Sequence, residues 1–226
     1  MQKELNSEGK CLLCGEKITK ADINKHLSIH LEEISKSKKT GQSFLVNVET
    51  NKRWGTSPYF LSLWVDGETT MKIIDKFLRD IWLECCGHLS RFNSAGMAKQ
   101  ARDVFKKGVR IDYEYDFGSS TSLTLTCINE YPVKADKKIV LLSRNEPLQI
   151  MCDICKKVPA TQICTVCMYQ GDAIFCDKCA PKHTKKCPDF EDYAALPVVN
   201  SPRMGVCAYT GGVIDRERDG VFVDLK

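Results

Sequence analysis

An α+β fold is predicted by three observations: apolar stretches typical of strands, an amphipathic helix between them, and groups of cysteine and histidine at both ends of the chain. The apolar fraction of 43% and the charged fraction of 27% are those of a globular protein. A length of 226 residues suits one ordinary domain with small modules attached. We therefore expect a central mixed or antiparallel sheet with two helices, flanked by small modules rich in Cys and His.

The first module is predicted at residues 1–34. Cys11-x-x-Cys14 is followed by His26-x-x-x-His30, which is close to the spacing of a ββα zinc finger. A helix over residues 22–31 would carry both histidines. The alternative is a chance cysteine pair near two helical histidines. Because so small a module has almost no core, we expect Cys11→Ala to unfold the finger and release about one zinc ion, while the main domain keeps its own unfolding transition.

A polar linker at residues 35–43 then leads to an α+β domain at residues 44–147. The predicted elements are strands at Phe44–Thr50 and Tyr59–Val65, a helix at Thr70–Cys86, a shorter helix from Met97 to Phe105 with Gly108 at its C-cap, and strands at Arg110–Phe117, Ser122–Tyr131 and Lys138–Leu142. The long helix is predicted from an apolar stripe at the i, i+3, i+4, i+7 spacing, which includes Ile74, Leu78 and Ile81. Pro132 is expected to mark a turn.

A second group of ligand-type residues fills a predicted module at residues 148–190. It comprises Cys152, Cys155, Cys164, Cys167, Cys176, Cys179, His183 and Cys187. Four such ligands close a tetrahedral zinc site and leave no position for water, so these sites would be structural. A disulfide framework is the alternative, but thirteen cysteines are an odd number and no signal peptide precedes them.

Two groupings of these ligands are open. The sequential one would place Cys176, Cys179, His183 and Cys187 in one site. Only three residues separate each later ligand from the one before it, so the chain has little length with which to fold back around the ion. The interleaved one, which we favour, is a cross-brace: Cys152, Cys155, Cys176 and Cys179 hold one zinc ion, and Cys164, Cys167, His183 and Cys187 hold the other. With the finger, the chain would bind about three zinc ions.

Some cysteines and one histidine remain outside these sets, namely Cys85, Cys86, Cys127, Cys207 and His88. We expect the spare thiols to be small buried apolar groups. The alternative is a fourth metal site that combines His88 with Cys207 and the neighbouring thiols.

The run Tyr113–Gly118 (YEYDFG), followed by an alternating strand, resembles the signature of the plasmid pRiA4b ORF-3-like family. The segment Trp82–Phe92 (WLECCGHLSRF) is similar to that family's helix-to-strand junction, with His88 and Leu89 opening the strand. CDICKKVPATQICTVC and RMGVCAYTGG resemble zinc-bearing members. The resemblance covers roughly residues 44–147 and implies an α+β core. The acidic residue and tryptophan usual after the glycine are replaced by Ser119 and Ser120.

Residues 191–226 show little periodicity and are predicted as an irregular tail. No apolar run is long enough to cross a bilayer, and residues 1–10 lack a signal-peptide core. We therefore expect a cytoplasmic protein with reduced thiols that does not bind membranes.

The most suggestive carboxylates are Asp112, Glu114 and Asp116, whose alternation would place all three on one side of a strand. They could bind a cation or a basic partner, although such a row is more often a solvated sheet face. An enzyme would act through this row or through His88. Asp116-Phe117-Gly118 also matches the kinase magnesium loop, but no other kinase motif accompanies it.

The sequence favours a zinc-binding, non-enzymatic interaction or adaptor protein with a protein partner. The alternative is a nucleic-acid-binding protein, associated with a mobile element, that uses Thr19, Asp22 and Lys25 of the finger. One finger reads only about three base pairs, and a net charge of +4 gives little affinity for phosphate.

Overall fold

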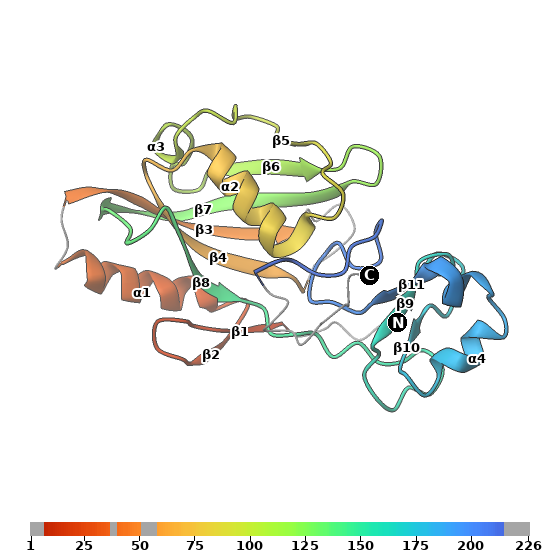
Figure 1. Ribbon diagram of the computed structural model, residues 1–226. Helices are drawn as coiled ribbons and strands as arrows, with labels where there is room; N and C mark the ends of the chain where they lie inside the picture. Colours follow the sequence, from red (N-terminus) through yellow and green to blue (C-terminus); the bar gives the residue numbers. More distant parts are fainter. Residues whose placement is uncertain (1–6, 37–39, 51–57, 215–226) are drawn as a thin grey trace. The chain divides into compact units, whose positions relative to one another are not determined.

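The computed structural model describes residues 7–36, 40–50 and 58–214, which form two compact units (Figure 1). The first unit comprises the chain up to Leu78 together with Leu89–Glu146. The second comprises Arg79–His88 and the chain from Pro147 onward. Each unit contains its own sheet, and the α+β class predicted from the sequence is confirmed.

The first unit is built on a six-stranded sheet with the order β5-β6-β7-β3-β4-β8. Its elements are β1 (Glu8–Lys10), β2 (Lys17–Thr19), α1 (Ile23–Ser35), β3 (Thr40–Thr50), β4 (Phe60–Asp66), α2 (Met71–Leu78), β5 (Ser90–Phe92), α3 (Ala101–Val104), β6 (Arg110–Tyr115), β7 (Thr121–Val133) and β8 (Ile139–Arg144). Every neighbouring pair of strands in this sheet is antiparallel.

Both faces of this sheet are covered. All of β4 is buried, and so is β3 from Ser43 to Val48, so neither strand has a solvated face. On one face, Leu27 and Leu31 of α1 pack with Leu45 and Trp64 in a single apolar cluster. Burial of both faces explains why these strands are almost continuously apolar and do not alternate with polar residues.

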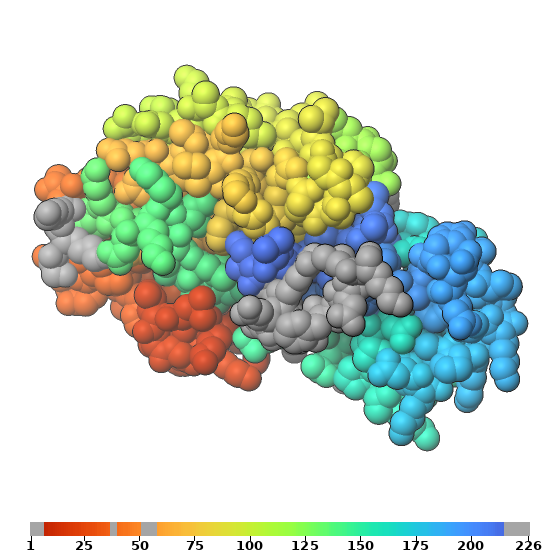
Figure 2. Space-filling view, in the orientation of Figure 1, coloured from red at the N-terminus to blue at the C-terminus, as the bar shows by residue number. Residues whose placement is uncertain are grey.

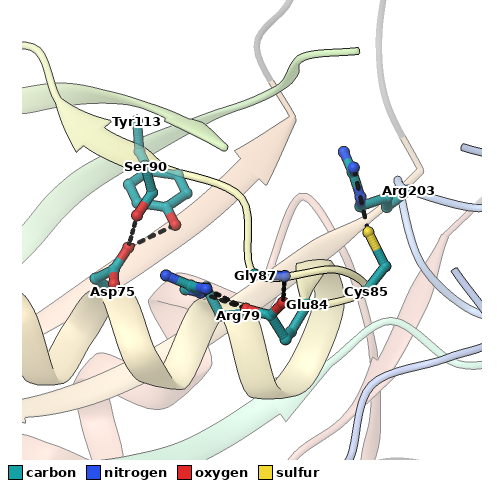
Figure 3. A network of polar contacts seen from close by, with 8 residues as sticks. All are labelled: Asp75, Arg79, Glu84, Cys85, Gly87, Ser90, Tyr113 and Arg203. Carbon is teal, nitrogen blue, oxygen red and sulfur yellow. Dashed lines mark hydrogen bonds and ion pairs between the residues drawn. The ribbon is translucent and has the colours of Figure 1, made fainter. Parts of the chain in front are cut away.

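The helix α2 covers the other face of the sheet (Figure 1). Its buried Asp75 accepts hydrogen bonds from Ser90 Oγ at 2.5 Å and from Tyr113 Oη at 2.8 Å. Figure 3 shows the three side chains converging. Because Tyr113 lies in β6, these bonds join the helix to the sheet and satisfy a carboxylate that would otherwise be expensive to bury.

The predicted zinc finger does not stand apart from the main domain. Its β1–β2 hairpin and α1 have the expected ββα order, but Cys11 and Ile23 lie in the same apolar cluster as the sheet residues. In Figure 2 the red atoms of the hairpin lie directly against the green atoms of β8. The expectation of a separate module is therefore wrong, because α1 supplies one of the two covers that the sheet needs.

The predicted linker at residues 35–43 is also too long. α1 extends to Ser35, and β3 already begins at Thr40. Residues 37–39 lie outside the described part of the chain. The long helix is shorter than predicted, since α2 ends at Leu78 and a π-helical turn, η2 (Arg79–Leu83), follows it.

The second predicted helix is confined to α3, whose C-cap is Phe105. Gly108 is left-handed, with φ of 84°, but it lies beyond the helix and donates its N–H to the Cys127 carbonyl. Pro132 lies inside β7, where a turn was expected. It is tolerated because β6 pairs with β7 only as far as Thr126, and the ladder with β3 is irregular next to it.

The second unit has a small three-stranded antiparallel sheet with the order β10-β9-β11. Its elements, besides η2, are β9 (Gln162–Cys164), β10 (Ile174–Phe175), α4 (Ala180–Thr184), the π-helical turn η3 (Phe190–Ala194) and β11 (Ala195–Pro197). The prediction of an irregular tail from residue 191 is wrong at its start, because η3 and β11 fall there and β11 pairs with β9.

Candidate metal centres

The structure brings the finger residues Cys11, Cys14, His26 and His30 together, with all ligand atoms within 4.8 Å of one another. The two histidine Nε2 atoms are 3.1 Å apart, and Cys14 Sγ lies 3.3 Å from His26 Nε2. With Zn–N bonds of about 2.0 Å, two nitrogens of a tetrahedral site lie about 3.3 Å apart. The spacing therefore fits one tetrahedral ion.

The backbone explains how two cysteines only three positions apart turn their sulfurs to one point. Gly15 follows the second cysteine, has φ of 83° and donates its N–H to the Cys11 carbonyl at 2.8 Å. Lys156 repeats this after Cys155, with φ of 52° and a bond of 2.9 Å to the Cys152 carbonyl. A left-handed backbone is uncommon outside glycine. The two cysteine pairs nevertheless share the same turn, with glycine at this position in one and lysine in the other.

The eight ligand-type residues of the second unit fall into the interleaved sets. Cys152, Cys155, Cys176 and Cys179 form one, and Cys164, Cys167, His183 and Cys187 form the other. The sequential grouping would join Cys176 and Cys179 to His183 and Cys187, and the structure separates these pairs. The Cys187 N–H donates to the His183 carbonyl at 2.9 Å, so these two ligands sit one helical turn apart although α4 itself ends at Thr184.

The distances between sulfurs suit a metal ion and exclude disulfides. Cys155 Sγ and Cys176 Sγ are 3.9 Å apart, as are Cys164 Sγ and Cys187 Sγ. Sulfurs bound to one tetrahedral zinc at about 2.3 Å lie about 3.8 Å apart, whereas a disulfide needs about 2.05 Å. All thirteen cysteines fall in the described part of the chain, and none is in a disulfide.

The four-thiol set has the charge properties of a cation site. Burial alone would raise the pKa of Cys152, but the N–H groups of Cys155, Cys176 and Ile154 lower it to about 6. Burial and the surrounding thiols, first that of Cys176, raise the pKa of Cys179 to about 12. One sulfur is thus held as a thiolate while another resists ionising beside it, and a bound cation would remove this conflict.

His183 is buried in the other set. Its ring stacks on Phe175 with centroids 4.2 Å apart and meets the edge of Phe190. Burial lowers its pKa, which favours the neutral ring that binds metals. The Nε2 atom has no hydrogen-bonding partner in the described part of the chain. A buried ring nitrogen in that state is what a metal ligand requires.

Two aspartates that the sequence analysis did not single out fasten the interleaved segments. Asp153, inside the first cysteine pair, accepts hydrogen bonds from the N–H groups of Ala173 and Ile174 at 3.0 and 2.9 Å. Asp177, inside the pair formed by Cys176 and Cys179, accepts one from Thr161 Oγ1 at 2.5 Å. Their shared place in two Cys-Asp-x-Cys runs was the available signal.

The predicted carboxylate row is only partly formed. Asp112 accepts a hydrogen bond from Thr124 Oγ1, and Glu114 pairs with Arg91 at 2.8 Å. Asp116 lies beyond the end of β6, is buried and left-handed with φ of 64°, and its carboxylate accepts from loop N–H groups. The expectation that all three face one side is wrong, because the chain turns at Asp116.

The spare thiols differ in burial, and Cys85 is half-buried. Cys127 is buried as expected, and burial raises its pKa to about 12. Cys86 and Cys207 are exposed, so the expectation of a buried thiol is wrong for them. Cys85, His88 and Cys207 form a fourth, three-residue group with ligand atoms within 4.8 Å of one another.

No family model matches the chain, and no curated protein matches it either. Among solved structures, a protein of unknown function from Methanosarcina mazei Go1 is similar, with 16% identity and a TM-score of 0.37. The match covers 46% of this chain and 68% of that one. Among the described helices, none has the length and apolar content that a bilayer span requires. The function is therefore argued from the site residues themselves.

Proposed function

We propose that this chain is a zinc-binding, non-enzymatic interaction protein of the cytoplasm, related to the pRiA4b ORF-3-like family. The observation that carries the proposal is that three separate sets of Cys and His each supply four ligand atoms to one point. Four protein ligands fill a tetrahedral site, so a metal there stabilises the fold and has no position left for a substrate. Thiolate and imidazole ligands in this geometry favour zinc.

The carboxylates support a binding role over catalysis. Asp112, Glu114 and Asp116 all take part in hydrogen bonds or ion pairs within their own unit. They are positioned to hold loops and strands together. A reduced compartment such as the cytoplasm suits thirteen cysteines outside disulfides, because metal ligands must stay as thiolates.

A protein partner is favoured by the apolar surface next to the four-cysteine set. Met151, Ile154 and Val158 are exposed and lie in one short hairpin, closed by a bridge between Met151 and Pro159. For the nucleic-acid alternative, Thr19, Asp22 and Lys25 of the finger are exposed. Asp22, however, carries negative charge and accepts a hydrogen bond from Thr19 Oγ1 at 2.7 Å, which disfavours contact with phosphate.

The test compares a hairpin variant, Met151→Ser with Ile154→Ser and Val158→Ser, with wild type and with Tyr169→Ser. Tyr169 is exposed and belongs to the same unit. Elemental analysis should give about three zinc ions or more for each protein. The proposal expects protein partners that copurify with wild type and Tyr169→Ser to be lost from the hairpin variant. Salt-sensitive binding of duplex DNA that the hairpin variant retains would support the nucleic-acid alternative.

A further inference from the structure

A group outside the three complete sets lies entirely in the second unit. Cys85, His88 and Cys207 come from two segments far apart in the sequence, yet their ligand atoms are within 4.8 Å of one another. Cys207 Sγ is 3.7 Å from His88 Nε2. A sulfur and a ring nitrogen bound to the same tetrahedral zinc ion lie about 3.6 Å apart.

The first two members have the ligand spacing used elsewhere in this chain. Cys85-x-x-His88 has two residues between its ligands, like each Cys-x-x-Cys pair of the complete sets. Gly87, which lies between the two ligands, has φ of 73°, whereas Gly15 and Lys156 follow the second ligand of their pairs. The Gly87 N–H donates to Glu84 Oε1 at 2.6 Å, and Glu84 is paired with Arg79 (Figure 3). The turn is thus held in place from η2.

The segment that carries Cys207 is fixed to the same turn of helix. Ser201 Oγ donates to the Trp82 carbonyl at 2.7 Å, and the Ile214 N–H donates to the Asp80 carbonyl at 3.2 Å. Gly212 approaches the Ile81 carbonyl so closely that a Cβ there would lie 2.1 Å from the oxygen. Contacts on both sides of Cys207 therefore hold it beside Cys85 and His88.

A buried arginine donates a hydrogen bond to one of the sulfurs. Arg203 is fully buried, and its guanidinium donates to Cys85 Sγ at 3.4 Å (Figure 3). Hydrogen bonds to the ligand atoms are the usual surroundings of a metal site.

Cys207 itself has φ of 52°, in the left-handed region. Such a backbone is strained in a residue other than glycine. The other described residues of this kind, Asp116 and Lys156, each close a tight turn. Cys207 likewise lies in a tight turn, in which the Tyr209 N–H donates to the Val206 carbonyl at 3.1 Å, and its side chain reaches the other two ligands.

We propose that Cys85, His88 and Cys207 bind a fourth zinc ion with an open coordination position. Among the described residues the group supplies three ligands, which leaves one position of a tetrahedral ion, and Cys207 is exposed while the other two are half-buried. Two thiolates and an imidazole favour zinc. Unlike the three complete sets, this site can accept a water molecule or a ligand from outside the chain, and its metal should exchange more readily.

The test counts metal in the full chain after equilibration with excess zinc under reducing conditions and removal of loosely bound ions. Wild type should hold one zinc ion per chain more than Cys207→Ser and His88→Ala. Cys86→Ser is the matched control, because Cys86 is an exposed neighbour outside the group, and it should hold as much as wild type. A count equal in wild type and Cys207→Ser, or a loss in Cys86→Ser, would overturn the proposal.

Cobalt loading separates an open site from a closed one. Azide should change the visible spectrum of the cobalt-loaded wild type and leave that of Cys207→Ser unchanged. Equal responses in the two proteins would contradict an open position at this site. Because the fourth ion is read as a difference between variants, the outcome is independent of the proposed function, which instead requires the three complete sets to be filled in all of them.

Discussion

The N–H of Leu12 donates to the carbonyl of Leu142 at 2.8 Å. Leu12 lies between the two cysteines of the finger, and Leu142 lies in β8 at the edge of the six-stranded sheet. The metal-binding turn is therefore bonded directly to the sheet. Removal of the metal should therefore destabilise β8 as well as the finger.

Cys11→Ala should lower the stability of the whole first unit. Cys11 is fully buried within the apolar cluster, and metal binding contributes on the order of 10 kcal/mol in isolated finger peptides. We expect the loss of about one zinc ion and faster amide exchange in β4 and β8, measured by mass spectrometry. Cys86→Ser, in the other unit, is the control. Unchanged protection of β4 would show that the finger folds separately.

Leu27→Ala should destabilise the same unit without removing a ligand. Leu27 is buried between α1 and the sheet, and truncating a buried leucine costs about 2–5 kcal/mol. Ile29→Ala, on the exposed side of the same helix, should stay within about 0.5 kcal/mol of wild type. Chemical denaturation of the zinc-loaded protein measures both. Equal effects of the two changes would contradict the packing of α1 on the sheet.

Cys152→Ala should loosen both metal ions of the second unit, because each interleaved site holds chain that leads to the ligands of the other. His183→Ala should do the same from the opposite set. Release of zinc to a chromophoric chelator measures the effect, and the two ions should leave together. If each variant lost a single ion and kept the other at the wild-type rate, the sites would be independent.

Acid should weaken the first unit in part through Glu114. The Ser120 hydroxyl, and then Arg91, lower the pKa of the Glu114 carboxyl. The folded pKa lies below the unfolded one, so the contribution is present above the unfolded pKa and is lost as pH falls through the folded pKa. Ser120→Ala should move the pKa of Glu114 upward in an NMR titration. Ser119→Ala is the control, and a shift as large in that variant would show that the Ser120 contact is not the cause.

Much of the fold could be predicted because its signals are local. The strands β3, β4 and β7 and the stripe of α2 are visible as apolar patterns, and the Cys-x-x-Cys spacing identifies the residues that come together. The ligand spacing predicts a separate finger because it is a local pattern, whereas the packing of Cys11 and Ile23 with the sheet depends on residues distant in the sequence. The nearly continuous apolar sequences of β3 and β4 indicate that both faces of the sheet are buried. The helix α1 covers one of these faces.

The remaining features depend on contacts that leave no periodic trace. β11 has three residues, and the segment around Cys207 is held by single hydrogen bonds such as that from Ser201 to Trp82. Asp116 leaves its strand through a left-handed backbone that an alternating pattern cannot reveal. The Cys85, His88 and Cys207 group was visible only as an alternative, because its last member comes from a remote segment.

The interleaved ligands also set an order for synthesis. When synthesis has reached Cys167, two half-complete sets have been made, one lacking its ligands from Cys176 onward and the other its ligands from His183 onward. The first set is completed at Cys179 and the second at Cys187, only a few residues later. Neither ion can be locked in while most of the module is being made, so the nascent chain carries unliganded thiols and then captures both ions almost at once.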